Sequence, residues 1–318
     1  MKCRKCDQKA VIHMRQHKLA LCKDHYLSWV PSKTSRTMEE YEMAHPGDRV
    51  LVAVSGGKDS LALWYILHIL GFAPDGLYIG LGIDDGSGYS NRSLKVTKDF
   101  ATEHGLHLIV ADVEELYGST IPEAASLSHR GREKPCSVCG LTKRHIMNHI
   151  ALEEGYDVLA TGHNLDDEAA VLFGNTLNWQ IGYLSRQGPV LGSKDGFVKK
   201  VKPLFRFYER DTAAFALLRG IEYIYEECPY AEGAKSIYYK EQLNILEANR
   251  PGAKLAFYLS FLRAKANEGF LKDVKMGTPL IACNSCGQPT TAPGTCAFCR
   301  TWDTIRATKH EKRKDGSE

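Results

Sequence analysis

Arg49-Val-Leu-Val-Ala-Val-Ser-Gly-Gly-Lys-Asp-Ser60 is the stretch of sequence that decides the fold of this chain. The apolar run at 49–55 is typical of a strand that is buried on both faces of a parallel sheet. A Gly-Gly turn follows it, and residues 60–70 then carry apolar side chains at helical spacing. A glycine-rich turn between a buried strand and a helix points backbone N–H groups and a helix N-terminus at an anion. The stretch therefore predicts a phosphate-binding loop, although not the Gly-x4-Gly-Lys-Ser/Thr loop of P-loop NTPases.

The alternation of strand and helix continues after this loop. We expect strands at 76–83, 107–113, 157–161 and 222–226, and helices at 91–104, 139–154, 166–177 and 209–218. This rhythm predicts an α/β fold with a doubly wound parallel sheet. Before it we expect a polar link at 32–37 and a helical stretch to about residue 44. After it we expect helices at 236–248 and 253–267.

Each end of the chain carries four potential metal ligands. Near the N-terminus two Cys-x2-Cys/His pairs, separated by fifteen residues, supply Cys3, Cys6, Cys22 and His25. Near the C-terminus two Cys-x2-Cys pairs, separated by nine residues, supply Cys283, Cys286, Cys296 and Cys299. Such pairs offer soft ligands on tight turns, as tetrahedral zinc prefers. Closed sites of four ligands predict two structural zinc ions; His13 and His17 fit the spacing poorly.

These patterns divide the chain into five parts. We expect an N-terminal zinc module at 1–32, a nucleotide-binding domain with its linker at 33–250 and a helical extension at 251–278. A C-terminal zinc ribbon at 279–303 and a tail at 304–318 follow. Residues 309–318 are charged and poor in apolar side chains, which predicts a frayed end.

Composition limits the class of protein. The 318 residues are 43% hydrophobic and 25% charged, as expected of a soluble globular protein with a sizeable core. No signal peptide or membrane-spanning run is evident, and ten cysteines in such a chain predict metal binding in a reducing cytoplasm. The net charge is only +3, but basic side chains concentrate at 1–30, 129–145 and 194–210. Such patches suit a nucleic-acid backbone as well as an ordinary solvated surface.

Three cysteines remain outside the terminal sets. Cys136 and Cys139 form a Pro-Cys-x-x-Cys step, and Cys228 lies far downstream. Three thiols suit an iron–sulfur cluster with one open iron, and they equally suit sulfur relay through persulfides and disulfides. The residues alone leave both alternatives open.

The motifs together resemble those of a known family. Ser55-Gly-Gly-Lys-Asp-Ser60 is similar to the pyrophosphate loop of the PP-loop ATP pyrophosphatases, and Gly162-His-Asn-x-Asp-Asp167 resembles a second motif of the members that act on tRNA. The three central cysteines and the two terminal modules narrow the resemblance to the tRNA 2-thiouridine synthetase branch. It extends over nearly the whole chain, from Cys3 to Cys299.

The resemblance implies a role for each matching residue. Around ATP it places Ala53, Ser55, Gly56, Gly57, Lys58, Asp59, Ser60, Lys143 and Gly162. It implies that Mg²⁺ accompanies the phosphates near Asp59, and that Cys136, Cys139 and Cys228 bind a [4Fe–4S] cluster. Lys143 and Asp167 are treated as catalytic in this branch, together with the three cysteines and Asp59. His163 and Asn164 are expected to orient the loop.

The implied reaction is ATP-dependent thiolation of tRNA. Adenylation of the C2 oxygen of a uridine makes AMP the leaving group, and sulfur then replaces the oxygen to give 2-thiouridine. The resemblance favours the T-loop ribothymidine at position 54 over the wobble uridine of the anticodon. It also implies a ubiquitin-like sulfur carrier that ends in a thiocarboxylate, and a homodimer.

Three alternatives stay open at this point. The same thiolation could use a cysteine persulfide, resolved by Cys228, without a cluster. The chain could instead be a zinc-dependent RNA-binding protein without catalysis, although an intact loop at 55–60 disfavours this. A lysidine-type PP-loop enzyme is the third alternative, and it would have no need of three central thiols.

Overall fold

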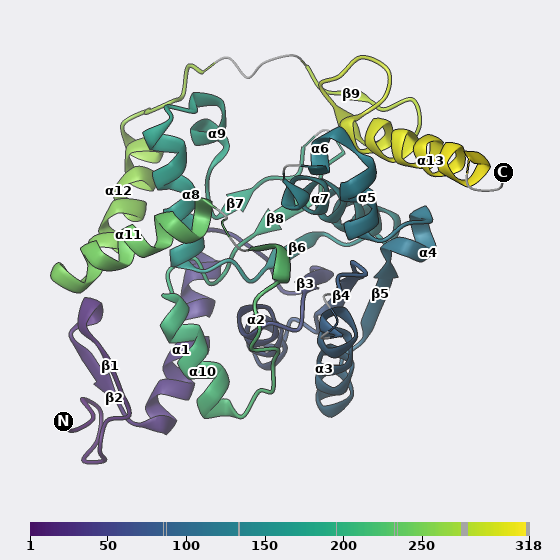
Figure 1. The fold of residues 1–318 in the computed structure, drawn as a ribbon. Coiled ribbons are helices and arrows are strands. Elements are labelled where there is room, and N and C mark those ends of the chain that lie inside the picture. The colour runs from purple at the N-terminus through teal and green to yellow at the C-terminus, as the bar shows by residue number, and fades with distance from the viewer. Residues whose placement is uncertain are drawn as a thin grey trace.

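A six-stranded sheet forms the centre of the molecule (Figure 1). The computed structural model describes residues 1–84, 86, 88–132, 134–194, 196–231, 233, 235–274 and 279–315. The strand order is β5-β4-β3-β6-β8-β7, and all neighbours are parallel except β7 and β8. The strands are β3 (Val50–Val54), β4 (Asp75–Gly80), β5 (Leu108–Asp112), β6 (Val158–Thr161), β7 (Val190–Leu191) and β8 (Lys199–Val201).

Helices cover both faces of this sheet, as a doubly wound fold requires (Figure 1). Val50, Val52 and Val54 of β3 point into one core, and Leu51 points into the other. The first core includes side chains of α1 (Lys23–Glu40), α2 (Lys58–Ile69), α3 (Tyr89–His104), α8 (Leu165–Leu177), α10 (Glu209–Arg219) and α12 (Ala253–Asn267). The second includes side chains of α4 (Val113–Tyr117), α5 (Ile121–Leu127), α7 (Pro135–Glu153) and α13 (Ala297–Asp315). The uninterrupted apolar run of β3 thus contributes side chains to both cores.

Two small modules flank the sheet domain. The N-terminal module has the hairpin β1 (Ile12–Met14) and β2 (Leu19–Leu21) with η1 (Arg15–His17) between them. The C-terminal module has β9 (Ile281–Ala282) paired with β10 (Pro289–Thr290), and it packs against α7 through Phe298 and Trp302. The remaining elements are α6 (His129–Arg132), α9 (Ile181–Arg186), η2 (Pro229–Ala231) and α11 (Lys235–Asn249).

The predicted fold class is confirmed, with four differences in its elements. Residues 222–226 form no strand. Ile224 N donates a backbone hydrogen bond to Gly56 O (2.9 Å), so this segment lies against the phosphate loop. The sheet instead gains β7 and β8. The predicted polar link at 32–37 is part of α1, because Val30, Thr34 and Met38 share one buried helical face.

The fourth difference concerns the tail. Helix α13 continues to Asp315, so residues 309–315 are helical and not frayed. Lys309 fixes this segment, since its ammonium lies 2.9 Å from Glu123 Oε1 on α5. Residues 275–278 of the predicted helical extension and residues 316–318 lie outside the described residues. None of the described helices has the length and apolar composition needed to cross a membrane.

Candidate functional site

The loop at 55–60 joins β3 to α2 in the conformation expected of a phosphate site. Ser55 N donates to Ser60 Oγ (3.1 Å), and this hydroxyl donates to Gly57 O (2.9 Å). Gly56 has φ +75°, and a Cβ there would lie 2.7 Å from Ser93 O. Only glycine fits this combination of left-handed backbone and close approach. The loop therefore holds its N–H groups at the N-terminus of α2, where an anion is favoured.

The second motif, at 162–167, lies directly beside this loop. It follows β6, whose Thr161 is paired with Ala53 of β3. A Cβ on Gly162 would lie 2.9 Å from the backbone of Asp59 and Ser60. Asn164 caps α8 by accepting a hydrogen bond from Asp167 N (3.1 Å), and Asp167 Oδ2 accepts one from Asn164 N (3.1 Å). Both motifs thus meet at the carboxyl ends of adjacent strands, where parallel α/β sheets bind ligands.

A network of charges connects the two motifs. Lys58 Nζ lies 2.8 Å from Glu209 Oε1 and 3.1 Å from Asp59 Oδ2. Lys240 Nζ lies 2.6 Å from Asp167 Oδ1 and 3.3 Å from Glu209 Oε2. Burial raises the pKa of Asp59, and the neighbouring Lys58 ammonium opposes this rise. Two basic side chains therefore hold three carboxylates in place around the phosphate loop.

Part of this network could not be recognised in the sequence. Glu209 begins α10, Lys240 lies within α11, and Thr212 donates a hydrogen bond to Asp59 Oδ1. Each is an ordinary polar residue of a helix, and no spacing signal distinguishes it. Only the packing of α10 and α11 near the loop gives these residues a role.

The three central thiols come together in space. Cys136 and Cys139 lie in the first turns of α7, and Cys228 immediately precedes η2, which packs on α7. Cys136 Sγ donates to Tyr230 O (3.3 Å). Burial raises the pKa of Cys139, the Lys143 ammonium lowers it, and the Cys228 and Cys136 thiols raise it again. Residues that are distant in the chain therefore act on one another electrostatically.

Lys143 acts on the central thiols, and Asp167 acts on the phosphate loop. Lys143 follows Cys139 by one helical turn and acts on its thiol. Asp167 raises the pKa of Asp59, which places its carboxylate beside the phosphate loop. Lys200 of β8 lies within electrostatic range of Lys143. His163 Nδ1 lies 2.9 Å from Thr161 Oγ1, which fixes its ring at the start of the second motif.

Both terminal sets have the geometry of a single-ion site. The Sγ atoms of Cys6 and Cys22 are 3.7 Å apart, and Cys3 Sγ lies 3.5 Å from His25 Nδ1. At the other end, Cys283 and Cys299 are 3.9 Å apart and Cys286 and Cys296 are 3.8 Å apart. Tetrahedral zinc with Zn–S bonds of about 2.3 Å requires sulfurs about 3.8 Å apart. The donor atoms of each set lie within 4.8 Å of one another.

The central thiols differ from these sets in their spacing. Over the described part of the chain, only the two terminal sets bring three or more such ligand atoms within 4.8 Å of one another. In an iron–sulfur cluster each cysteine ligates a different iron, so its thiolates lie farther apart than the ligands of one zinc ion. Three converging thiols without that close spacing therefore fit a cluster better than a mononuclear metal ion.

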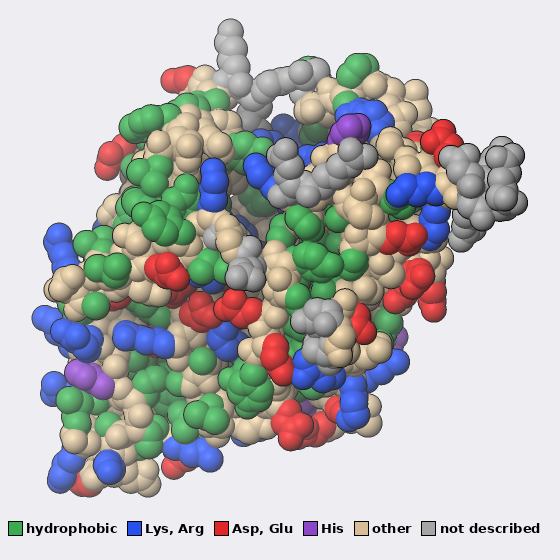
Figure 2. Space-filling view, viewed as in Figure 1, with side chains coloured by type: hydrophobic (Ala, Val, Ile, Leu, Met, Phe, Trp, Pro, Cys, Tyr) green, Lys and Arg blue, Asp and Glu red, His purple; other side chains and the backbone are tan. Residues whose placement is uncertain are grey.

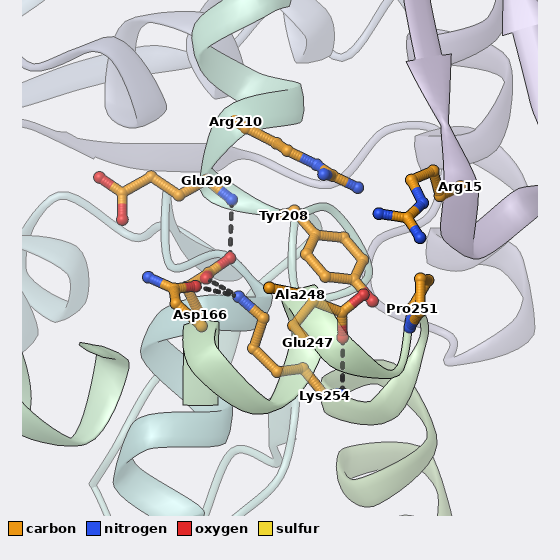
Figure 3. Close-up of a pocket in the computed structure, with 10 residues that line it drawn as sticks. Arg15, Asp166, Tyr208, Glu209, Arg210, Glu247, Ala248, Pro251 and Lys254 are labelled. Carbon is orange, nitrogen blue, oxygen red and sulfur yellow. Dashed lines mark hydrogen bonds and ion pairs between the residues drawn. The ribbon is translucent and has the colours of Figure 1, made fainter. Parts of the chain in front are cut away.

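A pocket of about 340 Å³ adjoins the charge network and is lined by Asp166, Glu209 and Lys254, among others (Figure 3). Figure 3 shows Lys254 reaching Asp166, and Asp166 Oδ2 also accepts a hydrogen bond from Glu209 N (2.8 Å). Glu247 accepts one from Lys254 N (3.0 Å). These contacts fix the N-terminus of α10, and hence the side chain of Glu209, toward Lys58. The contacts that line this pocket therefore stabilise the position of Glu209 beside the phosphate loop.

Comparison with protein-family models gives two matches. Residues 2–27 match "2-thiouridine synthetase TtuA, N-terminal LIM domain", and residues 30–229 match the PP-loop domain. The second match covers more than half of the chain. The two modules follow one another in the order that the sequence motifs predict.

Curated relatives match over nearly the full length. The tRNA-5-methyluridine(54) 2-sulfurtransferase of Thermus thermophilus is 54% identical over 314 residues, which cover 99% of this chain and 94% of the relative. The protein of that name from Pyrococcus horikoshii is 43% identical, over 95% of this chain and 94% of the relative. Among solved structures, the U34-tRNA thiolase NcsA from Methanococcus maripaludis with its [4Fe-4S] cluster has a TM-score of 0.78 at 26% identity. The similarity covers 95% of this chain and 96% of that chain.

Proposed function

Because this chain belongs to the tRNA-5-methyluridine(54) 2-sulfurtransferase family of PP-loop enzymes, we propose that it thiolates position 54 in the T loop of tRNA. ATP is consumed and the C2 oxygen of the base is replaced by sulfur. The observation that best supports this proposal is that the motifs at 55–60 and 162–167 meet at the ends of adjacent strands, in a chain whose three central thiols also converge. NcsA is a U34-tRNA thiolase, and the higher identity of the position-54 relatives favours the T loop here.

The first step is adenylation of the base. The C2 oxygen attacks the α-phosphorus of ATP, and the bond to the β-phosphate oxygen breaks so that pyrophosphate leaves. Ser55, Gly56, Gly57 and Ser60 would hold the pyrophosphate through backbone N–H groups and hydroxyls, and Ala53 and Gly162 would lie against the nucleoside. Lys58 would offset the charge that develops on the phosphates. Mg²⁺ would accompany ATP next to Asp59.

The second step exchanges oxygen for sulfur. A sulfur nucleophile attacks C2, the C2–O bond breaks, and AMP leaves. We propose that Cys136, Cys139 and Cys228 hold a [4Fe–4S] cluster, and the [4Fe-4S] cluster of the similar NcsA structure supports this proposal. Such a cluster, when bound, supplies an iron with no protein ligand at which sulfur can be held.

The neighbouring side chains prepare the base for this exchange. Lys143 would stabilise negative charge on the adenylate phosphate, because its ammonium is exposed one turn beyond Cys139. Asp167 would orient the base or accept a proton, and its ion pair with Lys240 fixes the carboxylate. His163 and Asn164 would hold the second motif in position beside the phosphate loop.

The remaining assignments follow from the terminal modules and the family. Each terminal set would hold a structural zinc ion, because its spacing fits tetrahedral ligation. A ubiquitin-like protein with a C-terminal thiocarboxylate would deliver the sulfur, and two chains would form a homodimer. The enzyme would act in the cytoplasm.

A reconstituted reaction tests the proposal. Anaerobically prepared protein is incubated with ATP, a sulfide source and tRNA that carries 5-methyluridine but no thiolated base. Nucleoside mass spectrometry should detect the 2-thio nucleoside in a T-arm fragment, with release of pyrophosphate. Fully active protein without iron would favour the persulfide route, and thiolation confined to the anticodon fragment would overturn the assignment to position 54.

A further inference from the structure

Several basic side chains near the central thiols have no acidic partner among the residues that the structure describes. The lysines around the phosphate loop are neutralised: Lys58 and Lys240 pair as described, and Lys202 Nζ lies 2.7 Å from Glu168 Oε1. By contrast, no described carboxylate forms an ion pair with Arg130, Arg144 or Lys200. Arg130 Nε donates a hydrogen bond to the uncharged hydroxyl of Ser137 (2.9 Å). Such uncompensated charge predicts an anionic ligand.

Lys200 lies on the face of the sheet that α7 covers. Its register partner on the neighbouring strand β6 is Leu159, which points into the second core together with side chains of α7. Burial, together with the charges of Lys202, Arg144 and Lys143, lowers the pKa of Lys200 to about 8. The acid that favours the charged form of Lys200, Glu168, is already bonded to Lys202 (2.7 Å) and to Tyr258 (2.8 Å). The Lys200 ammonium is thus half-buried among other cations.

Arg144 connects this cluster to exposed aromatic side chains. Burial and the charge of Arg130 lower the pKa of Arg144, whereas the Tyr183 phenol and the Cys139 thiol raise it. The guanidinium is therefore within electrostatic range of both the Cys139 thiol and Tyr183 of α9. Tyr183 is 61% exposed, and the Arg186 guanidinium lies over its ring at 5.5 Å. Trp179, just before α9, is 67% exposed.

The shape of the surface agrees with this arrangement. Figure 2 shows Lys and Arg side chains within a hollow between the part of the molecule that holds α8 and α9 and the part that holds α6 and α13. Exposed aromatic rings beside unpaired cations are the features that bind unstacked RNA bases and their phosphates. A protein partner would instead be expected to meet an apolar centre, because the buried cores of protein interfaces are depleted of charged residues.

We propose that Arg130, Arg144 and Lys200, with Tyr183 and Trp179 at the rim, form the surface on which tRNA docks to present its target base. The cations contact the backbone phosphates, and the aromatic rings stack on bases of the opened loop. This inference rests on the proposed function, because it takes tRNA as the substrate. It assigns tRNA binding to residues that lie outside the sequence motifs of the chain.

Equilibrium binding of fluorescently labelled, unthiolated tRNA tests the surface, with the full-length protein at several salt concentrations. Tyr183→Ala should weaken binding about 5- to 150-fold, since stacking on one aromatic ring contributes about 1–3 kcal/mol per base. Tyr183→Phe keeps the ring and should bind within about twofold of the wild type. Arg144→Gln should lower the slope of log K against log salt by about 1. Lys98→Gln, an exposed lysine on α3 at the other end of the sheet, is the matched charge control and should change neither quantity.

The outcomes separate this inference from the proposed function. If the wild type thiolates tRNA while Tyr183→Ala and Arg144→Gln bind it as the wild type does, the docking surface is wrong and the function stands. If the wild type binds tRNA through these residues but thiolates no base, the function fails and the surface stands. If the variants change the oligomeric state or the binding of a sulfur-carrier protein but not of tRNA, the hollow is a protein interface and the inference is overturned.

Discussion

The Lys240 ammonium lies 2.6 Å from the Asp167 carboxylate, and it joins α11 to the N-terminus of α8. The same ammonium lies 3.3 Å from Glu209, which in turn binds Lys58 of the phosphate loop. Burial lowers the pKa of Lys240, but the Asp167 and Glu209 carboxylates outweigh this effect and raise it above its ordinary value. Lys240 is therefore charged at neutral pH and fixes the proposed catalytic aspartate relative to the ATP site.

Replacement of Lys240 should reduce turnover more than it reduces ATP binding. Lys240→Met removes the common partner of Asp167 and Glu209, and the freed carboxylates repel one another. Misplaced catalytic groups commonly cost up to about a hundredfold in rate, so we expect thiolation to fall about 10- to 100-fold. The measurement compares kcat for thiolation with the Kd for ATP.

Lys235→Met is the control for this variant, because Lys235 is exposed at the start of the same helix. It should retain wild-type turnover. Wild-type kcat in Lys240→Met would show that the ion pair does not position Asp167.

The sequence predicts most strongly those features whose chemistry depends on residues close together in the chain. The loop at 55–60 and the terminal sets around Cys6 and Cys296 have the predicted local organisation, because a turn or a knuckle is encoded by spacing. Strand β8 has the residues Lys-Lys-Val and offers no apolar periodicity, so it was not predicted. Residues 222–226 have β-forming side chains, but the loop after β3 provides their backbone partner. Local preference is overridden there by tertiary contact.

Substitution of Gly56 should disable the phosphate loop. In Gly56→Ala the new Cβ would meet Ser93 O at 2.7 Å, at a backbone φ of +75°. The left-handed conformation alone costs about 1–2 kcal/mol, and the collision forces the loop away from α3. We expect ATP binding and pyrophosphate release to be lost while the protein stays folded.

Gly118→Ala separates the two contributions. Gly118 has φ +81°, and a Cβ there would have no atom within 4 Å. This variant should lose stability by about 1–2 kcal/mol but keep its ATP affinity. Equal loss of ATP binding in both variants would mean that the close approach to Ser93 is unimportant.

Replacement of Cys228 should affect iron and leave zinc unchanged. Cys228→Ala removes the one central thiol outside α7, so we expect a loss of bound iron and no detectable thiolation. Zinc content and the unfolding temperature should stay at wild-type values, and the terminal sets serve as controls within the same sample. Wild-type turnover in this variant would remove Cys228 from the mechanism.

Loss of a terminal ligand should instead act on stability. Cys296 is buried in the second core, near Trp302, whose indole N–H donates to Thr142 Oγ1 (3.2 Å) on α7. Structural zinc sites contribute about 10–16 kcal/mol to folding in small modules. Cys296→Ser should therefore lower zinc from two ions per chain to one and unfold the C-terminal module, as a change in Trp302 fluorescence would show. An unchanged zinc content would contradict the tetrahedral assignment.

Asp211 should make stability depend on pH. Burial raises its pKa to about 6, although hydrogen bonds from Tyr208 N (3.2 Å) and Gln16 Nε2 (3.3 Å) to Oδ2 favour the charged form. The other carboxylate oxygen is buried without a hydrogen-bond partner. Its unfolded pKa is about 3.9, so the folded state binds the proton more tightly. The stabilisation is complete below about pH 4 and is lost as the pH rises through about 6.

Asp211→Asn tests this dependence, because the amide keeps an acceptor for Tyr208 and Gln16 but cannot ionise. Relative to the variant, the wild type should lose up to about 3 kcal/mol of unfolding free energy between pH 4 and 7. Urea unfolding of both proteins at each pH, with zinc content measured in parallel, gives this difference. If the difference stays constant over the range, the Asp211 carboxylate has its ordinary pKa, and the contact between the N-terminal module and α10 does not cause the loss of stability as the pH rises.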